Sequence, residues 1–435
     1  MRGPVIRIAF VGALVSSAVS LVVVLGAASA PLGQEPRPVN QQQRPRKVAA
    51  PQNNNSAATP SKENGAAKPK ENATPQPKEN GAPEEVAEGD VVRVDTELVA
   101  VPTVVTDRNG LPVKGLASDN FALFEDGAAQ RITNFASTEA PFEIALLLDT
   151  SGSTRAELQL IRDAATEFVK MLRPGDRLAI VAFKNVQRGS SQEPEIQIQS
   201  PLTSDRRSIQ DAINNIGTSS GTPFYDSLNR IADQVFQNSP RPEVIGRRAV
   251  VALTDGVDSS SESDFAQAQA KLLRAGLASY LIEVETEGYV DARLIKDCDD
   301  DDRLGLSVKQ LERYRRLFDP DARPELYQDF CRLGQNRRLD ISRKLYELAR
   351  REMNDMARYS GGHNFVVADL SEARSAFAQV ANELGTQYSL AYYPSNKIRD
   401  GRFRQIRVEL RNVNYASVRA REGYFSRNDN SASIK

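Results

Sequence analysis

The stretch EIALLLDTSGST, residues 143–154, decides the fold. Its apolar run shows no polar alternation, which is typical of a strand buried on both faces of a parallel sheet. Helical periodicity follows in ELQLIRDAATEFVKML at 157–172 and again in FYDSLNRIADQVFQ at 224–237. Further apolar runs of the same kind are RLAIVAFK (177–184), RRAVVALTD (247–255) and LASYLIEVE (277–285). This alternation of strands and helices predicts an α/β fold.

The predicted fold is a doubly wound, mostly parallel sheet of the Rossmann-like kind, spanning about residues 139–386. In such open sheets the ligand site lies beyond the carboxyl ends of the strands. We therefore expect the functional residues of this chain directly after its strands.

Oxygen-bearing side chains do follow these strands. Asp149, Ser151 and Ser153 come after the first strand, Thr222 precedes a helix in SSGTPFYDSL, and Asp255 ends the run at 247–255. A site with only oxygen ligands suits a hard divalent cation, Mg²⁺ or Mn²⁺. If the three hydroxyls contact the ion and the two carboxylates act through water, the direct protein ligands are neutral. The ion then stays electrophilic and can accept a carboxylate from a partner.

At these residues the chain resembles a von Willebrand factor A (VWA) domain. The metal-ion-dependent adhesion site of that family has the pattern D-x-S-x-S, then a distant Thr and a distant Asp. All of these positions are filled here, by Asp149, Ser151, Ser153, Thr222 and Asp255. The resemblance implies a VWA fold, a bound divalent metal and binding to a protein partner that presents an Asp or Glu, without catalysis.

A narrower resemblance extends on both sides of this domain. DRNGLPVKGLASDNFALFEDG at 107–127 precedes it, and YYP at 392–394 with VRAREGYF at 418–425 follows it. Together these segments are similar to the VWFA-related proteins typical of Acidobacteria. This resemblance covers about residues 94–425, and it also implies metal-dependent protein binding.

The same residues allow other interpretations. Asp149 and Ser151 could cap the helix that begins near Thr154, because Asp and Ser are favoured at that position. The ion could also merely stabilise the fold of a structural envelope protein. An enzyme is not expected, since there is no G-x-x-x-x-G-K-[ST] motif and the single histidine, His363, excludes sites that need two imidazoles. A net charge of −1 gives no basic field for nucleic acid.

The N-terminal residues predict export. Residues 1–30 are expected to be a signal peptide or signal anchor, because Arg2 and Arg7 precede an uncharged run at 8–30 that could also serve as a membrane anchor. Residues 31–90 are rich in Pro, Gln, Asn, Lys and Glu, and predict a disordered linker. We expect an exported protein that is periplasmic, extracellular or membrane-anchored facing outward.

Strand-like sequences flank the central domain at 91–138 and at 387–426, with a short tail at 427–435. Within the first flank, FALFE is expected to pair with QRITNF across the Asp126-Gly127 turn. Neither flank has enough strands to form a stable packed unit by itself. The two flanks are therefore predicted to form one small β-domain together.

An insertion is expected at about 288–348, between the run at 277–285 and the last predicted strand of the central sheet. It contains both cysteines, Cys298 and Cys331, which in an exported protein suggest a disulfide. Its acidic run at 297–302 lacks the Gly and distal Glu of a calcium-binding EF-hand loop, so a solvated loop is favoured. The sequence leaves open whether the insertion lies near the metal edge of the sheet or at the opposite end.

Overall fold

The computed structural model describes residues 98–136, 140–151, 157–300 and 303–428 of the 435-residue chain, and all of them belong to one compact unit. The predicted signal segment (1–30) and linker (31–90) lie outside the described residues and stay predictions. Ser153 of the predicted metal site also lies outside them.

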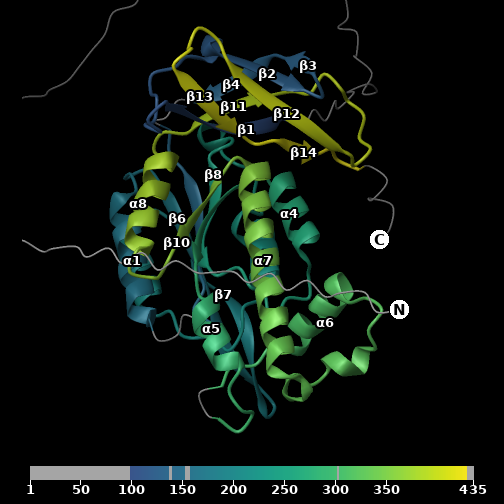
Figure 1. The fold of residues 1–435 in the computed structure, drawn as a ribbon. Helices are drawn as coiled ribbons and strands as arrows, with labels where there is room; N and C mark the ends of the chain where they lie inside the picture. The colour runs from purple at the N-terminus through teal and green to yellow at the C-terminus, as the bar shows by residue number, and fades with distance from the viewer. Residues whose placement is uncertain (1–97, 137–139, 152–156, 301–302, 429–435) are drawn as a thin grey trace, which may run out of the picture. The chain divides into compact units, whose positions relative to one another are not determined.

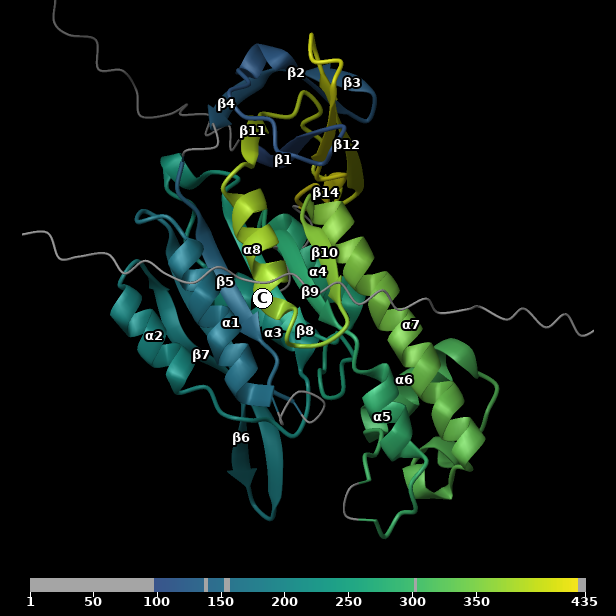
Figure 2. The same cartoon turned by 60° about the vertical axis from the view of Figure 1, so that its left-hand side comes forward.

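Within the described residues, the central sheet has six strands in the order β10-β9-β8-β5-β6-β7. All six are labelled in Figure 2, and Figure 1 gives the second view. Neighbouring strands are parallel except β6 and β7, which are antiparallel. The strands are β5 (Glu143–Leu148), β6 (Arg177–Arg188), β7 (Ser191–Thr203), β8 (Arg248–Thr254), β9 (Ala278–Val284) and β10 (His363–Val367). The predicted α/β fold with a mostly parallel sheet is confirmed.

Helices cover both faces of this sheet (Figure 2). One face packs against α1 (Leu158–Met171), α2 (Arg206–Asn214) and α8 (Ala373–Leu384). The other face packs against α3 (Phe224–Arg230), α4 (Phe265–Arg274) and α7 (Gln335–Ser360). A π-helical turn at Ile231–Val235 continues α3, and a 3-10 turn at Pro242–Val244 precedes β8. Every residue of β5 and β8 is buried, which explains why their sequences show no polar alternation.

The edge strand β7 is a strand that the sequence analysis missed. It pairs antiparallel with β6 through a tight turn in which Gly189 has a φ of +62°. Because the connection is so short, the chain forms a hairpin there instead of crossing over through a helix. The alternation of Ile196 and Ile198 with glutamines is the signal of a half-buried strand that was available in the sequence.

The flanking strands form two small antiparallel sheets, in the orders β13-β1-β11-β4 and β14-β12-β2-β3. Strand β1 from the N-terminal flank lies between β11 and β13 from the C-terminal flank, and β2 pairs with β12. The predicted joint β-domain is therefore confirmed. Its strands are β1 (Val99–Asp107), β2 (Phe121–Glu125), β3 (Ala128–Gln130), β4 (Ile132–Ala136), β11 (Tyr388–Tyr392), β12 (Phe403–Leu410), β13 (Ala416–Ala420) and β14 (Gly423–Phe425), with a 3-10 turn at Ser118–Asn120.

The predicted pairing of FALFE with QRITNF is only partly right. Across the turn, β2 pairs with β3, and Leu123 lies opposite Gln130. The chain then leaves this sheet, and β4 pairs with β11 in the other sheet, where Phe135 lies opposite Leu390. The reason is aromatic packing, because the Phe135 ring stacks on the buried Tyr388 ring with centroids 5.9 Å apart.

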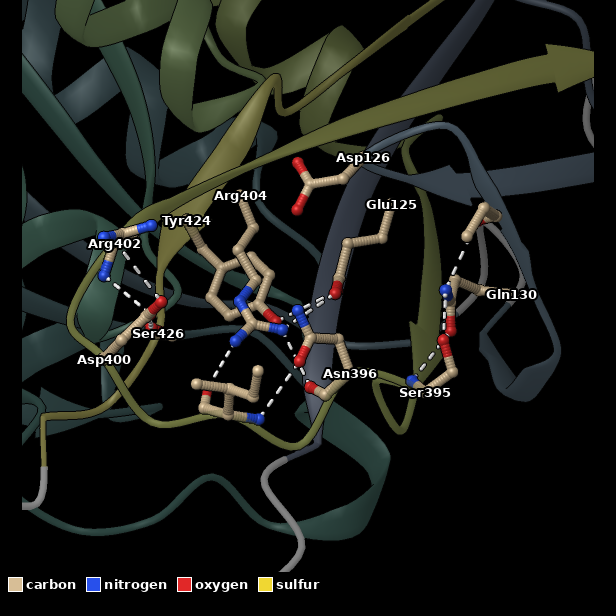
Figure 3. Close-up of polar contacts among 12 residues, drawn as sticks. Glu125, Asp126, Gln130, Ser395, Asn396, Asp400, Arg402, Arg404, Tyr424 and Ser426 are labelled. Carbon is tan, nitrogen blue, oxygen red and sulfur yellow. Dashed lines mark hydrogen bonds and ion pairs between the residues drawn. The ribbon is translucent and has the colours of Figure 1, made fainter.

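A buried carboxylate ties the β-domain together (Figure 3). Glu125, only 2% exposed, accepts hydrogen bonds from Tyr392 at 2.6 Å, Tyr424 at 3.0 Å and Arg404 at 3.2 Å. These partners come from β11, β14 and β12, so the contacts join strands of both small sheets. Because each member of this cluster is paired, burial of the charge is compensated.

The β-domain docks at the amino-terminal ends of the central strands. Arg247, directly before β8, donates to the backbone oxygen of Gln387 at 2.6 Å. Arg421, which follows β13, donates to the backbone oxygen of Leu273 at the end of α4 at 3.0 Å. The carboxyl ends of the central strands lie at the opposite end of the sheet and are not covered by the β-domain.

The insertion forms a small helical subdomain with its own core. It contains α5 (Glu287–Leu294), α6 (Val308–Phe318), 3-10 turns at Pro324–Tyr327 and Phe330–Arg332, and the first half of α7. Its core residues are Leu294, Leu311, Tyr314, Tyr327, Phe330, Ile341 and Leu345. A disulfide joins Cys298 to Cys331. No break marks the end of the insertion, because the 26-residue helix α7 runs on from it to pack against β9 and the sheet.

Candidate metal-binding site

The two predicted carboxylates lie side by side because of the sheet register. β5 and β8 are parallel neighbours, with Leu148 opposite Leu253. Asp149 follows β5 and Asp255 follows β8, so both emerge at the same edge of the sheet.

Asp149 is fixed by hydrogen bonds that it accepts. It is 1% exposed, and its Oδ1 accepts the backbone N–H of Ser151 at 3.0 Å while its Oδ2 accepts the hydroxyl of Thr254 at 2.7 Å. Burial, followed by the negative charge of Asp255, raises the pKa of Asp149 to about 7. Two buried carboxylates in each other's field are stabilised by a cation between them or near them.

Asp255 is held by its own loop and by the residue just before the insertion. Its Oδ1 accepts the N–H of Val257 at 3.1 Å, and its Oδ2 accepts the hydroxyl of Thr286 at 2.7 Å. The Thr286 hydroxyl also lies 2.8 Å from the hydroxyl of Tyr346 on α7. Gly256 has a φ of +71°, and an added Cβ there would lie 2.6 Å from the Met353 side chain, so this turn requires glycine. The backbone after β8 therefore turns sharply under α7.

Thr222 is positioned by two reciprocal hydrogen bonds between its own loop and the loop after β8. Its N–H donates to the Ser259 hydroxyl at 2.8 Å, and the N–H of Ser259 donates back to the Thr222 oxygen at 3.0 Å. Asp258, 8% exposed, accepts the N–H of Tyr225 at 3.2 Å and the hydroxyl of Ser261. Asp258 therefore has a local hydrogen-bonding role, which fixes the start of α3 against the loop that carries Asp255.

A pocket of about 340 Å³ opens at this edge of the sheet. Ser151, Thr222 and Asp255 line it together, and the buried Asp149 accepts the backbone N–H of Ser151. The structure thus brings together four of the predicted site residues, while Ser153 lies outside the described residues. The N-cap of α1 (Leu158–Met171) is Glu157, so neither Asp149 nor Ser151 caps that helix. The predicted helix start near Thr154 lies outside the described residues, so the capping alternative stays open there.

The chemistry of these side chains fits a hard divalent cation. Among the described residues, no group of three or more His, Cys, Asp or Glu is placed to hold a metal ion. The oxygens offered at this edge are the hydroxyls of Ser151 and Thr222 and the carboxylates of Asp149 and Asp255. Such an oxygen-only set suits Mg²⁺ or Mn²⁺.

Three residues that support the site were not predicted from the sequence. Thr254 and Thr286 each hold a carboxylate. Thr254 ends β8 and Thr286 lies two residues after the end of β9, at the edge where functional residues were expected. Their positions at the ends of predicted strands could have indicated them from the sequence. Tyr346 lies 60 residues beyond Thr286 in the chain, and no local pattern pointed to it.

The insertion lies at the metal edge, which settles the question that the sequence left open. Ser307 donates its hydroxyl to the Ser259 oxygen at 2.6 Å, and Lys309 donates to the Ser260 oxygen at 2.8 Å. Arg313 on α6 forms an ion pair with Glu352 on α7 at 2.7 Å, and Glu352 also accepts the hydroxyl of Tyr225 at 2.6 Å. The insertion is therefore docked on the loop that carries Asp255.

Residues 144–257 match the family model of the von Willebrand factor type A domain. This span contains all of the predicted metal-site residues, and the fold around it is the α/β fold described above. The chain therefore contains a VWA domain, a class that typically carries a metal-ion-dependent adhesion site, binds proteins and is usually not catalytic.

Solved structures that match this chain share little sequence with it and have low TM-scores. A conserved hypothetical protein BatB from Bacteroides thetaiotaomicron is 16% identical, with 56% of this chain and 98% of that chain covered and a TM-score of 0.34. A von Willebrand factor type A protein from Catenulispora acidiphila is 10% identical, with 79% and 77% covered and a TM-score of 0.35. Proximal thread matrix protein 1 from the mussel byssus, solved with a zinc-occupied MIDAS motif, is 14% identical, with 61% and 50% covered and a TM-score of 0.35.

This chain spans about half the length of the mussel byssus protein that it matches. No curated protein matches the chain.

The disulfide between Cys298 and Cys331 suggests an oxidising, extracytoplasmic compartment. In the parts of the chain that the structure describes, no helix is long and apolar enough to cross a membrane.

Proposed function

We propose that this chain is an exported protein-binding module of the cell envelope that holds a divalent metal ion and uses it to coordinate an acidic residue of a partner protein. The observation that carries the proposal is the open pocket at the carboxyl edge of the sheet. There Ser151, Thr222 and Asp255 line one pocket, and Ser151 donates its backbone N–H to the buried Asp149.

Each predicted residue has a distinct part in this proposal. Ser151, Ser153 and Thr222 would offer hydroxyl oxygens to the ion, and Asp149 and Asp255 would act through water. When bound, Mg²⁺ or Mn²⁺ would supply a positive centre for a partner's carboxylate. Thr254 and Thr286 hold the two carboxylates in place by donating hydroxyl hydrogens to them.

We also propose a cellular location, a non-catalytic role and domain limits for this chain. The module would be periplasmic, extracellular or anchored through residues 8–30 facing outward, with residues 31–90 as linker. We propose no catalytic activity and no nucleic-acid partner. We retain the boundaries 91–138, 139–386 and 387–426 as proposed domain limits, with 427–435 as a tail. The similarity to VWFA-related proteins of Acidobacteria stays a prediction.

A second candidate is a structural envelope protein in which the ion only stabilises the fold. The burial of both Asp149 and Asp255 favours it, because a cation near two buried carboxylates stabilises the folded state whatever happens at the surface. The two candidates differ in whether a partner's retention depends on the metal.

The test has two measurements on the full-length chain. Isothermal titration with Mg²⁺ measures metal affinity, and a pull-down from envelope extract measures partner retention in Mg²⁺ and in EDTA. The variant Asp149→Ala is compared with Asp211→Ala, an exposed aspartate on α2 that serves as the matched control. We expect Asp149→Ala to weaken Mg²⁺ binding by about tenfold or more and to abolish retention, while Asp211→Ala behaves as wild type.

The outcomes separate the candidates. Retention that is equal in Mg²⁺, in EDTA and in Asp149→Ala, with Mg²⁺ still bound by the wild type, would support the structural alternative. Absence of Mg²⁺ and Mn²⁺ binding to the wild-type chain would contradict both candidates.

A further inference from the structure

The pocket at the metal edge is built from two different parts of the chain. One side comes from the VWA loops and presents the oxygens of Ser151, Thr222 and Asp255. The opposite side comes from the insertion. Its lining residues there include Val290, Arg303, Leu304, Leu306, Leu345 and Tyr346. The insertion side is mixed, because Ser307, Gln310 and Ser342 line it as well. Leu304, Leu306 and Leu345 are the apolar wall within it.

The apolar wall is fixed in place before any ligand arrives. Leu345 belongs to the core of the insertion, and Leu304 and Leu306 are half-buried against that core. Leu304 and Leu306 are also held from their carboxyl side. Ser307 follows them as the N-cap of α6, and its hydroxyl donates to the Ser259 oxygen. A partner would not have to order this wall, which lowers the cost of binding.

Polar groups without a partner lie in the same wall. Ser342 is 1% exposed, and its hydroxyl has no hydrogen-bond partner among the described residues. The Nε of Arg303 is also buried, and it too lacks a partner there. Buried polar groups in proteins are nearly always paired, and an unpaired one costs free energy. Both groups can donate a hydrogen, so both suit a ligand that brings carbonyl or carboxylate oxygens.

We propose that the insertion determines the specificity of the site, and that the pocket takes an extended partner segment in which a large apolar side chain neighbours the metal-bound Asp or Glu. The carboxylate would lie at the wall of Ser151, Thr222 and Asp255, and the apolar side chain would pack between Leu304, Leu306 and Leu345. Arg303 and Ser342 would donate to main-chain oxygens of that segment. This inference rests on the proposed metal-dependent function and adds to it the chemical class of the partner.

The test uses an array of short peptides with aspartate fixed at the centre and the flanking positions varied, probed with the full-length chain in Mg²⁺ and in EDTA. We expect Mg²⁺-dependent signals that require the aspartate and are strongest where a Leu, Ile, Met or Phe adjoins it. Replacing that apolar neighbour by Ser should weaken binding about tenfold, as expected for loss of a buried side chain.

Variants of Leu306 test whether the apolar wall of the insertion causes the preference for an apolar neighbour. Leu306→Ala should remove the preference for an apolar neighbour, and Leu306→Met should keep it. Leu326→Ala, an exposed leucine in the same insertion that does not line the pocket, is the matched control and should behave as wild type.

Two results would overturn the inference and leave the proposed function standing: Mg²⁺-dependent aspartate signals with no apolar preference, or an apolar preference that survives in Leu306→Ala. Absence of any Mg²⁺-dependent aspartate signal would instead count against the proposed function, and the inference would fall with it.

Discussion

The two ends of strand β5 place a buried carboxylate in opposite surroundings. At the amino end, Glu143, 1% exposed, accepts hydrogen bonds from Arg177 and Arg248, each at 2.8 Å. At the carboxyl end, Asp149 is equally buried but accepts from a backbone amide and the Thr254 hydroxyl, in the field of Asp255. The two carboxylates lie at the two ends of one strand and are equally buried. They differ in the chemistry of the groups around them.

This difference separates the framework from the binding edge. The charge of Glu143 is balanced by arginines of the protein itself, so its cluster joins β5, β6 and β8 and gains nothing from an added ion. Burial and the charge of Asp255 raise the pKa of Asp149, so a cation bound at the carboxyl end would stabilise it. The comparison predicts that substitutions at the amino end change stability, whereas those at the carboxyl end change metal binding.

The largest effect is expected at the amino end. Glu143→Ala leaves Arg248, whose side chain is 8% exposed, without its ion-pair partner and should lower the free energy of unfolding by about 3–5 kcal/mol. Urea unfolding measures this loss. The control is Glu243→Ala, which removes an exposed pair with Arg241 and should change stability by no more than about 0.5 kcal/mol. Equal effects of the two substitutions would show that the Glu143 cluster is not a stabilising centre.

The next largest effect is expected on the stability of the insertion, whose residues line the pocket at the carboxyl end. Replacing both Cys298 and Cys331 by Ala opens a loop with a sequence separation of 33 residues and should cost about 3–4 kcal/mol in the chain-entropy account. Urea unfolding of this variant, with and without Mg²⁺, measures the loss. Unchanged stability would mean that the core around Tyr314 and Phe330 orders the insertion without the bridge.

A smaller effect is expected from the metal itself. Mg²⁺ at about a hundredfold excess over its Kd should raise the free energy of unfolding of the wild type by about 2.7 kcal/mol. Asp149→Ala should lose this increment. Arg241→Ala, at the amino end, should keep it in full, because distant sites act independently. If Arg241→Ala lost the increment as well, the two ends of the sheet would be coupled and the comparison would fail.

Much of the binding edge could be predicted because its signals are local. The apolar runs predicted β5 and β8, and Asp149 and Asp255 follow them directly, so parallel pairing alone places these carboxylates together. The Cys298–Cys331 bridge needed only the cysteine count and an export signal.

What could not be predicted depends on contacts between distant segments. The insertion reaches the metal edge through Ser307 and Ser259, which are 48 residues apart in the chain. Strand β4 leaves its hairpin because Phe135 packs on Tyr388, in the other flank. Packing between distant segments determines where the insertion docks and which strand β4 pairs with. A local pattern of residue types does not encode that packing.

The smallest effect tests whether the insertion also acts on the metal edge. Thr286→Val keeps the shape of a side chain that is 7% exposed but removes the hydroxyl that holds Asp255 and contacts Tyr346. Mg²⁺ affinity should fall about tenfold, as when other groups that orient metal ligands are removed, and Thr286→Ser should restore it. Titration calorimetry under conditions where all three proteins are folded measures this change. Equal Mg²⁺ affinity in Thr286→Val and the wild type would mean that Asp255 is positioned by its own loop, through Val257 and Gly256. The contact between α7 and the metal edge would then contribute packing alone, and the insertion would act on the partner only through the pocket wall.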